Sequence, residues 1–296
     1  MTSSSHTASQ AASETSELLP TAPLLGTRGL PFRHALMSHR GGSLEHVENT
    51  MPGFRFSANE LKADLLELDV QLTKDGQVVI FHDNDMARMC GAAFKGKHIG
   101  DFNFDELPPL QIPDKVKHLP DVVSDPESTR IPLLRALLSE FPQYPMQIDV
   151  KNGSEELVLK VGHMIQEFRR EQLTVWGSFL SRPSKLCYKY FGTSIPMFFS
   201  LLRFLKAFAL NFIGLLGWME IHEQALIVPN FGIFISPSLI RALQRRGVSV
   251  IVFGRQDGGM NKVEDWEQVR RLGANGICSD APSRLQAWLK ENPLPM

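Results

Sequence analysis

The chain has 296 residues, of which 43% are hydrophobic and 21% charged, and its formal net charge is −1. This is the composition of an ordinary globular protein with enough apolar residues for one large core. The near-neutral charge provides no basic field to attract nucleic acid, so that class of partner is disfavoured. Three widely spaced cysteines, Cys90, Cys187 and Cys278, argue against a disulfide framework and against a cysteine-ligated metal.

The N-terminal segment, residues 1–33, is rich in Ser, Thr and Ala and contains no apolar run of signal-peptide length. It lacks the hydrophobicity needed to fold alone, which predicts a disordered tail. Within it, Glu14–Leu19 resembles an acidic dileucine sorting signal, although such strings are common by chance. We therefore expect one folded catalytic domain over residues 34–296.

From residue 34 onward, short apolar runs typical of strands alternate with helix-length stretches. The runs are Ala35–His39, Leu65–Val70, Met146–Val150, Leu173–Gly177, Ile195–Phe199, Ala225–Val228, Val248–Phe253 and Gly276–Ser279. Continuous apolar strands separated by amphipathic helices predict a parallel sheet buried on both faces. Eight such units in one chain predict an α/β fold closed as a single (β/α)8 TIM barrel.

One additional strand pattern follows the second unit. Thr73–Gly76 has the composition of a turn, and Val78–His82 after it is apolar and β-branched. A turn between two such runs predicts a hairpin that leaves the barrel after the second strand, rather than a ninth barrel strand.

Ionisable side chains gather at the predicted strand ends, where barrels of this kind place their active sites. His39 and Arg40 follow the first strand, and His82 ends the hairpin. Glu67 and Asp69 lie two residues apart, and so on one face of the second strand, as Asp149 and Lys151 do on the third.

These residue types together suit one chemistry. Buried carboxylates need a positive charge beside them, and a hard divalent cation, Mg²⁺ or Ca²⁺, would satisfy Glu67, Asp69 and Asp149 together. Arg40 and Lys151 are suited to binding a phosphate. The imidazoles at positions 39 and 82 titrate near neutral pH and are candidates for the acid and the base.

Each residue also has a plainer interpretation. A single histidine at a strand end is usually structural, Glu67 and Asp69 could form a salt-bridged rim pair, and Lys151 could be a solvated residue before a helix. Three strand ends with the same chemistry are harder to explain structurally, so we favour a phosphodiester site.

The order of these motifs resembles the glycerophosphodiester phosphodiesterase (GDPD) domain family. The matching elements are His39-Arg40-Gly41, Glu48-Asn49-Thr50, Glu67-x-Asp69, Asp75-Gly76, His82-Asp83 and the closing Gly273–Pro282. Ser38–Gly42, Leu65–Asp69, Ile148–Lys151 and Leu173–Gly177 resemble its lysophospholipase D branch. The resemblance implies metal ligation by Glu67, Asp69 and Asp149, acid–base catalysis by His39 and His82, and phosphate binding by Arg40 and Lys151.

The activity implied by this resemblance is metal-dependent hydrolysis of lysophospholipids, giving lysophosphatidic acid and the headgroup alcohol, or of glycerophosphodiesters. In the family, the glycerol 2-hydroxyl is thought to attack phosphorus, and a cyclic phosphate would then be hydrolysed. The chain departs from the family pattern at Phe253 and Gln256, where Trp and Asn are usual, which puts headgroup preference in doubt. Two alternatives stay open: an enzyme restricted to soluble glycerophosphodiesters, and a catalytically silent barrel that binds lipid or protein.

The most apolar segment, residues 197–219, is long enough to span a bilayer. Arg203 and Lys206 within it would each cost about 2.5 to 3.5 kcal/mol at mid-membrane, so we reject a transmembrane helix. The pattern instead predicts an amphipathic helix that lies in a membrane interface, with Phe204, Phe208 and Phe212 as lipid-docking residues. The alternative is an outer barrel helix packed on the sheet. We expect a cytoplasmic protein peripherally associated with intracellular membranes.

Overall fold

The computed structural model describes residues 29–230, 232–254 and 258–295. The strands are β1 Leu36–Ser38, β2 Leu65–Leu72, β3 Val78–Ile80, β4 Met146–Val150, β5 Thr174–Gly177, β6 Ala225–Pro229, β7 Ser249–Phe253 and β8 Gly276–Ser279. The α-helices are α1 Met51–Arg55, α2 Ala87–Cys90, α3 Pro120–Ser124, α4 Leu134–Glu140, α5 Glu155–Glu167, α6 Ser181–Phe191, α7 Leu201–Phe212, α8 Pro237–Gln244, α9 Val263–Leu272 and α10 Pro282–Glu291.

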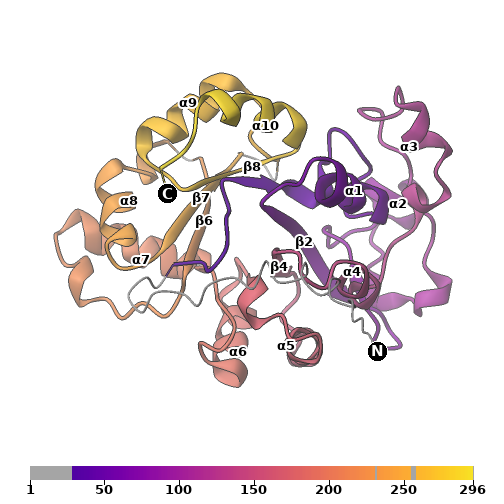
Figure 1. The fold of residues 1–296 in the computed structure, drawn as a ribbon. Coiled ribbons are helices and arrows are strands. Elements are labelled where there is room, and N and C mark those ends of the chain that lie inside the picture. The colour runs from indigo at the N-terminus through magenta and orange to yellow at the C-terminus, as the bar shows by residue number, and fades with distance from the viewer. Residues whose placement is uncertain (1–28, 231, 255–257, 296) are drawn as a thin grey trace, which may run out of the picture.

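All of these strands except β3 form a parallel barrel, and the helices surround it (Figure 1). The pairing order is β5-β4-β2-β1-β8-β7-β6, so the first and last strands of the chain are neighbours. Large apolar side chains fill the barrel and the layer between strands and helices, among them Met37, Leu65, Val175 and Ile251. The predicted TIM-barrel fold is confirmed.

The fifth predicted strand, Ile195–Phe199, is reduced to isolated bridges. Met197 is bridged to Trp176 on β5, and Phe198 is bridged to Ala225 on β6. Pro196 lacks an N–H and cannot donate to a ladder, which shortens the pairing here. The segment still accepts and donates backbone hydrogen bonds on both sides, as from Trp176 N to the Pro196 carbonyl at 2.9 Å. It therefore lies where an eighth barrel strand is needed, between β5 and β6.

The hairpin predicted after the second strand is present. β3 is antiparallel to β2, with Val70 opposite Ile80 and Leu72 opposite Val78. The turn closes through the Thr73 N–H, which donates to the Gln77 carbonyl at 3.0 Å, and Gly76 supplies the positive φ of 78° that the turn requires. The hairpin brings His82 back toward the barrel mouth, which is why it matters for the site.

The predicted N-terminal tail spans residues 1–33, and residues 1–28 of it lie outside the described residues. The dileucine-like string falls within this undescribed part. Leu30 is buried, and its N–H donates to Ser249 Oγ at 3.3 Å. The packed part of the chain thus reaches a few residues before the predicted boundary at residue 34.

The apolar segment 197–219 is not one continuous helix. Its first residues belong to the barrel wall, α7 covers Leu201–Phe212, and a single 3-10 turn, η8, covers Leu216–Trp218. Within the described ranges, no helix combines the length and apolar character needed to cross a bilayer.

Candidate active site

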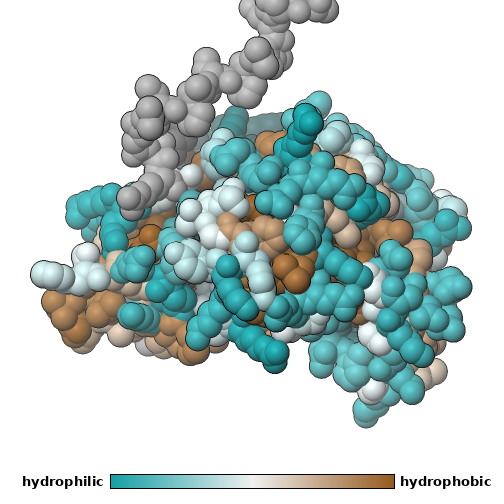
Figure 2. Space-filling view, turned by 90° about the horizontal axis from the view of Figure 1, so that it is seen from below, coloured by the Kyte–Doolittle hydropathy of each residue, from teal (hydrophilic) through white to brown (hydrophobic). Residues whose placement is uncertain are grey.

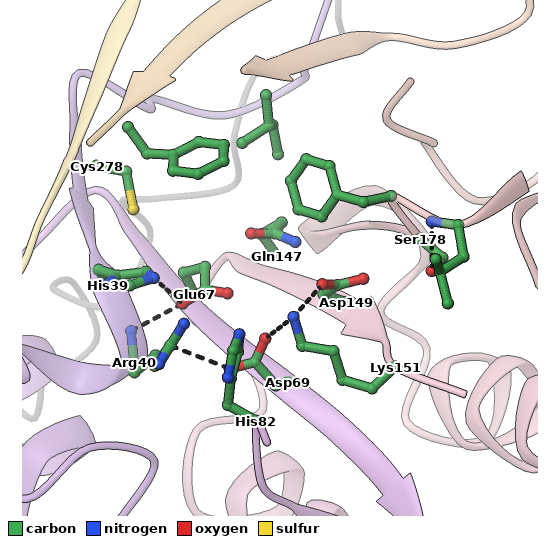
Figure 3. Close-up of a pocket in the computed structure, with 14 residues that line it drawn as sticks. His39, Arg40, Glu67, Asp69, His82, Gln147, Asp149, Lys151, Ser178 and Cys278 are labelled. Atoms are coloured by element: carbon green, nitrogen blue, oxygen red, sulfur yellow. Dashed lines mark hydrogen bonds and ion pairs between the residues drawn. The ribbon is translucent and has the colours of Figure 1, made fainter. Parts of the chain in front are cut away.

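A cavity of about 310 Å³ opens at the carboxyl ends of the barrel strands (Figure 3). All seven residues predicted for metal binding, catalysis and phosphate binding line it. The full lining is His39, Arg40, Glu67, Asp69, His82, Gln147, Asp149, Lys151, Ser178, Phe179, Leu180, Ile227, Phe253 and Cys278. The residues inferred from three strand ends and one hairpin therefore meet in a single place.

A tight turn after β1 sets the floor of this cavity. Arg40 adopts a left-handed conformation, with φ 51° and ψ 33°, and Gly41 and Gly42 also have positive φ. A non-glycine residue in this region is strained and is kept there by its surroundings. Here the turn directs the Arg40 N–H to Glu67 Oε2, at 2.8 Å, and so fixes the carboxylate of Glu67 beside the imidazole of His39.

His39 is oriented by Asp280, which follows β8. Its Nδ1 lies 2.5 Å from Asp280 Oδ1, and Asp280 also accepts from Ser43 Oγ, Asn261 Nδ2 and the Gly259 N–H. Burial, together with the nearby Arg40 charge, lowers the pKa of His39. Asp280 thus holds Nδ1 of the ring, while Nε2 points into the cavity, 3.9 Å from Glu67 Oε2.

His82 is held by a second acidic partner. Its Nδ1 lies 2.7 Å from Asp83 Oδ1, and Arg88 on α2 donates to both oxygens of Asp83. Arg88 also donates to both oxygens of Glu48, at 2.7 Å each, and Glu48 in turn accepts from Arg40 at 3.0 Å. Although burial would raise it, the pKa of Glu48 is lowered to about 2 because Arg88 and Arg40 hold its carboxylate. One guanidinium thus connects the supports of His82 and Arg40.

Three buried carboxylates share the centre of the cavity with one ammonium group (Figure 3). Lys151 Nζ lies 2.9 Å from Asp69 Oδ1 and 2.6 Å from Asp149 Oδ2. Burial raises the pKa of Glu67 and of Asp149, whereas the charge of Lys151 is the main factor that keeps the pKa of Asp69 low despite its burial. Burial therefore opposes ionisation of Glu67 and Asp149, while Lys151 and Arg40 favour it at Asp69.

The same carboxylates have the donor chemistry of a site for a hard divalent cation. Their oxygens are the ligands that Mg²⁺ and Ca²⁺ prefer, and Asp149 Oδ1 is buried without a hydrogen-bond partner. In the part of the chain that the structure describes, no three such side chains are yet arranged as a metal-binding group. The Lys151 ammonium lies between two of these carboxylates, 2.9 Å from Asp69 Oδ1 and 2.6 Å from Asp149 Oδ2.

The opposite side of the cavity is apolar. Phe179, Leu180, Ile227 and Phe253 line it, and the Phe179 ring lies 5.7 Å from that of Phe253. Phe253 stands at the first of the two positions that depart from the family pattern, and it extends this aromatic wall. The second, Gln256, falls outside the described residues.

The predicted lipid-docking residues fall in three environments. Phe204 is only 4% exposed and packs in the core, so a docking role for it must be corrected. Phe208 is partly buried, with its ring 5.2 Å from Phe234. Phe212 is 83% exposed. The helical periodicity identified a broad apolar face. The barrel covers the part that carries Phe204 and leaves the part that carries Phe212 exposed.

Residues 39–284 match the profile of the Glycerophosphoryl diester phosphodiesterase family. The chain belongs to this family. GDPD membership makes the protein a phosphoric diester hydrolase, as predicted.

Among its GDPD relatives, Lysophospholipase D GDPD1 of Rattus norvegicus is 33% identical over 277 residues, covering 86% of this chain and 85% of its own length. Lysophospholipase D GDPD3 of Mus musculus is 32% identical over 294 residues, covering 91% and 84%. These similarities confirm the predicted branch of the family.

Solved GDPD structures share the fold. The glycerophosphodiester phosphodiesterase of Agrobacterium tumefaciens superposes with a TM-score of 0.66 at 19% identity, covering 86% of this chain and 99% of that one. A phosphodiesterase of Oleispira antarctica, solved in complex with the product sn-glycerol-3-phosphate, gives 0.65 at 19% identity, covering 86% and 96%.

Several polar residues of the site were not assigned roles from the sequence. Asp280, Asp83 and Glu48 lie within the GDPD-like motifs, and Asp83 directly follows His82, but their partners became visible only in three dimensions. Gln147 precedes Asp149 by two residues and shares its strand face; its buried Nε2 has no hydrogen-bond partner and is available as a donor. The strand periodicity that paired Asp149 with Lys151 could have found it.

Proposed function

We propose that this protein is a lysophospholipase D that also accepts small glycerophosphodiesters. The observation that carries the proposal is the division of one cavity into a charged side and an aromatic side. A lysophospholipid has the same division, with a phosphodiester next to a glycerol that bears one acyl chain. The names of the curated relatives support the same substrate class. An enzyme limited to soluble diesters would have no use for the apolar wall.

The proposal includes one divalent cation, Mg²⁺ or Ca²⁺, held by Glu67, Asp69 and Asp149. When bound, such an ion stabilises negative charge on the phosphate oxygens. The burial of three carboxylates and the orphaned Asp149 Oδ1 support this ligand set.

His39 is the proposed general base. Asp280 holds Nδ1 of the ring and Nε2 points into the cavity, so Nε2 is the atom that would accept the proton of an attacking hydroxyl. In a 1-acyl lysophospholipid or a glycerophosphodiester that hydroxyl is the glycerol 2-hydroxyl. Its attack on phosphorus would break the bond to the headgroup alcohol and form a cyclic phosphate, which water would then open to the phosphomonoester. His82, supported by Asp83, is the proposed acid that protonates the departing headgroup alcohol.

Arg40 and Lys151 are the proposed phosphate-binding residues. By holding the phosphate they would position the diester between the two imidazoles. The Arg40 guanidinium is fixed from behind by Glu48, and Lys151 is the more accessible of the two, with a side chain 22% exposed. Cationic groups held in place before the reaction stabilise charge that develops on phosphate oxygens.

The test is direct product analysis. Purified protein is incubated with labelled lysophosphatidylcholine and, separately, with glycerophosphocholine, each with EDTA, with added Mg²⁺ or with added Ca²⁺. We expect lysophosphatidic acid and free choline from the lipid, no turnover in EDTA, and recovery with one of the two ions. Turnover of glycerophosphocholine alone would limit the enzyme to soluble substrates, and no turnover of either would indicate a silent barrel.

A matched pair of variants accompanies this assay. Glu67→Gln removes one proposed ligand charge from the cavity, whereas Glu167→Gln changes an exposed glutamate on α5 that pairs with Arg135 on the surface. We expect the first to lose activity at every ion concentration and the second to behave as the unmodified protein. Equal activity of the two variants would contradict the metal assignment.

A further inference from the structure

A second hollow, of about 550 Å³, lies between α6 and α7, outside the active-site cavity. We call it the basic groove. It is lined by Ser181, Ser184, Lys185, Tyr188, Lys189, Ser200, Leu202, Arg203, Lys206, His222 and Glu223. Four of these side chains are cationic and one is acidic, and the catalytic proposal uses none of them.

The charges of the basic groove are unequally neutralised. Arg203 donates to both oxygens of the buried Glu223, so this pair contributes little net charge. Lys189 contacts the phenol of Tyr190, at 2.8 Å, and that phenol donates to Glu155. Lys185 and Lys206 are exposed. The groove therefore has a net positive charge, and all three lysine ammonium groups can reach an anion outside the protein.

Beside the groove, the outer face of α7 and the turn after it carry a row of exposed apolar side chains. We call this row, made up of Leu202, Leu205, Phe212, Ile213 and Trp218, the apolar ridge. Trp218 is 88% exposed and Phe212 is 83% exposed, and these are the highest exposed fractions among the large apolar residues of the described part of the chain. In Figure 2, hydrophobic residues gather at the left edge of the molecule, the side on which Figure 1 places α7.

The inner face of α7 anchors this arrangement. Phe204 and Ala207 are buried in the core, and the Phe208 ring packs on Phe234. The helix is therefore fixed to the barrel by one face while the other points to solvent. An exposed apolar row on a fixed helix is the form that inserts into the boundary between lipid headgroups and acyl chains.

The groove and the catalytic cavity share one loop. Leu180, which is 55% exposed, lines the cavity, and Ser181 directly after it lines the groove. The same loop is tied to α7, because the Leu201 N–H donates to the Phe179 carbonyl at 3.0 Å. A surface in contact with α7 would thus be next to the aromatic wall of the active site.

We propose that the apolar ridge and the basic groove together form a docking surface for anionic lipid bilayers, with the ridge inserted and Lys185, Lys189 and Lys206 on the headgroup phosphates. We choose an anionic bilayer because its charge complements that of the protein. The apolar ridge fits the acyl region of such a bilayer, and the three ammonium groups beside the ridge fit its negatively charged headgroups. The inference adds a preference for anionic lipid to the proposed function and rests on that function only for the lipid nature of the substrate.

The experiment is co-sedimentation of the full chain with vesicles of phosphatidylcholine alone and of phosphatidylcholine with 30% phosphatidylserine. Hydrolysis of water-soluble glycerophosphocholine is measured on each variant in parallel. We expect binding to the anionic vesicles that weakens with salt. Lys185→Gln with Lys206→Gln is expected to weaken it by roughly fivefold per lysine, and Phe212→Ser with Trp218→Ser to abolish sedimentation at the same lipid concentration.

Matched controls separate docking from general charge and hydrophobicity. Lys290→Gln on α10 removes an exposed lysine outside the groove, and Val123→Ser on α3 removes an exposed apolar residue outside the ridge. Both controls are expected to sediment like the unmodified protein. Equal sedimentation of ridge, groove and control variants, or no binding to anionic vesicles, overturns the docking surface. Preserved vesicle binding without hydrolysis of either substrate overturns the proposed function instead.

Discussion

The two halves of the barrel mouth are built on opposite principles. On the side of β1, β2 and β4, ionisable side chains are each held by several partners, as His39 is by Asp280 and as Arg40 is by Glu67 and Glu48. On the side of β5, β6 and β7, the cavity is lined by Phe179, Ile227 and Phe253. The contact between the two aromatic rings there defines the shape of the cavity wall but orients no polar group.

This difference separates two tasks. Groups that transfer protons or hold phosphate must be oriented to within a fraction of an ångström, and networks of charged hydrogen bonds provide that precision. An acyl chain needs apolar area without fixed direction, which aromatic rings provide. Changes on the charged side should therefore affect every substrate, and changes on the aromatic side only those with an acyl chain.

The largest effect is expected at His39. Replacing it with Gln keeps a polar side chain of similar size but removes the proposed base, and we expect kcat to fall by roughly 10²- to 10⁴-fold. The fall should be the same for lysophosphatidylcholine and glycerophosphocholine, measured by choline release. A loss restricted to the lipid would break the division between the two halves.

A smaller effect is expected at Arg88, which does not line the cavity. Arg88→Gln removes the guanidinium that donates to Asp83 and Glu48. Because Asp83 holds His82 and Glu48 holds Arg40, both of those side chains lose part of their support. We expect kcat to fall by roughly 10- to 100-fold, with KM little changed. Arg135→Gln, at an exposed fork with Glu167, serves as the control and should leave kcat unchanged.

On the aromatic side, Phe253→Ala is expected to act selectively. The variant loses the ring that packs on Phe179, and we expect KM for lysophosphatidylcholine to rise roughly tenfold, in line with a few methylenes of lost contact. KM for glycerophosphocholine should stay within about twofold, because that substrate has no acyl chain. A parallel rise for both substrates would show that Phe253 positions the diester itself.

The smallest effect is expected at the outer edge of that side. Phe212→Ser should change the free energy of unfolding by less than about 0.5 kcal/mol, because its side chain is 83% exposed. Phe204→Ser, on the same helix but buried, should cost about 3 to 5 kcal/mol. Urea unfolding measures both, and similar values would contradict the two-faced placement of α7.

The barrel and the seven ionisable residues of its mouth could be predicted from the sequence because the strands and the residues at their ends follow local patterns. Apolar runs mark strands, and Glu67, Asp69, Asp149 and Lys151 share strand faces by their spacing alone. Long-range contacts leave no such pattern. Asp280 lies 241 residues from His39, and no periodicity connects them.

Two other differences have physical causes in packing. Ile195–Phe199 reads as a strand, but Pro196 limits its pairing to bridges. The helical wheel of 197–219 found an apolar arc without saying which part the barrel would cover, so Phe204 and Phe212 received the same role although one is buried and the other exposed.

The contact between His39 and Asp280 has a consequence for biosynthesis. One partner ends the first strand of the barrel and the other follows the last, and β1 pairs with β8. A nascent chain that has released most of the barrel from the ribosome still lacks the carboxylate that orients the proposed base. If His39 is that base, hydrolysis of phosphodiesters begins only after the final strand has docked, and we expect translation products that end before residue 280 to be inactive.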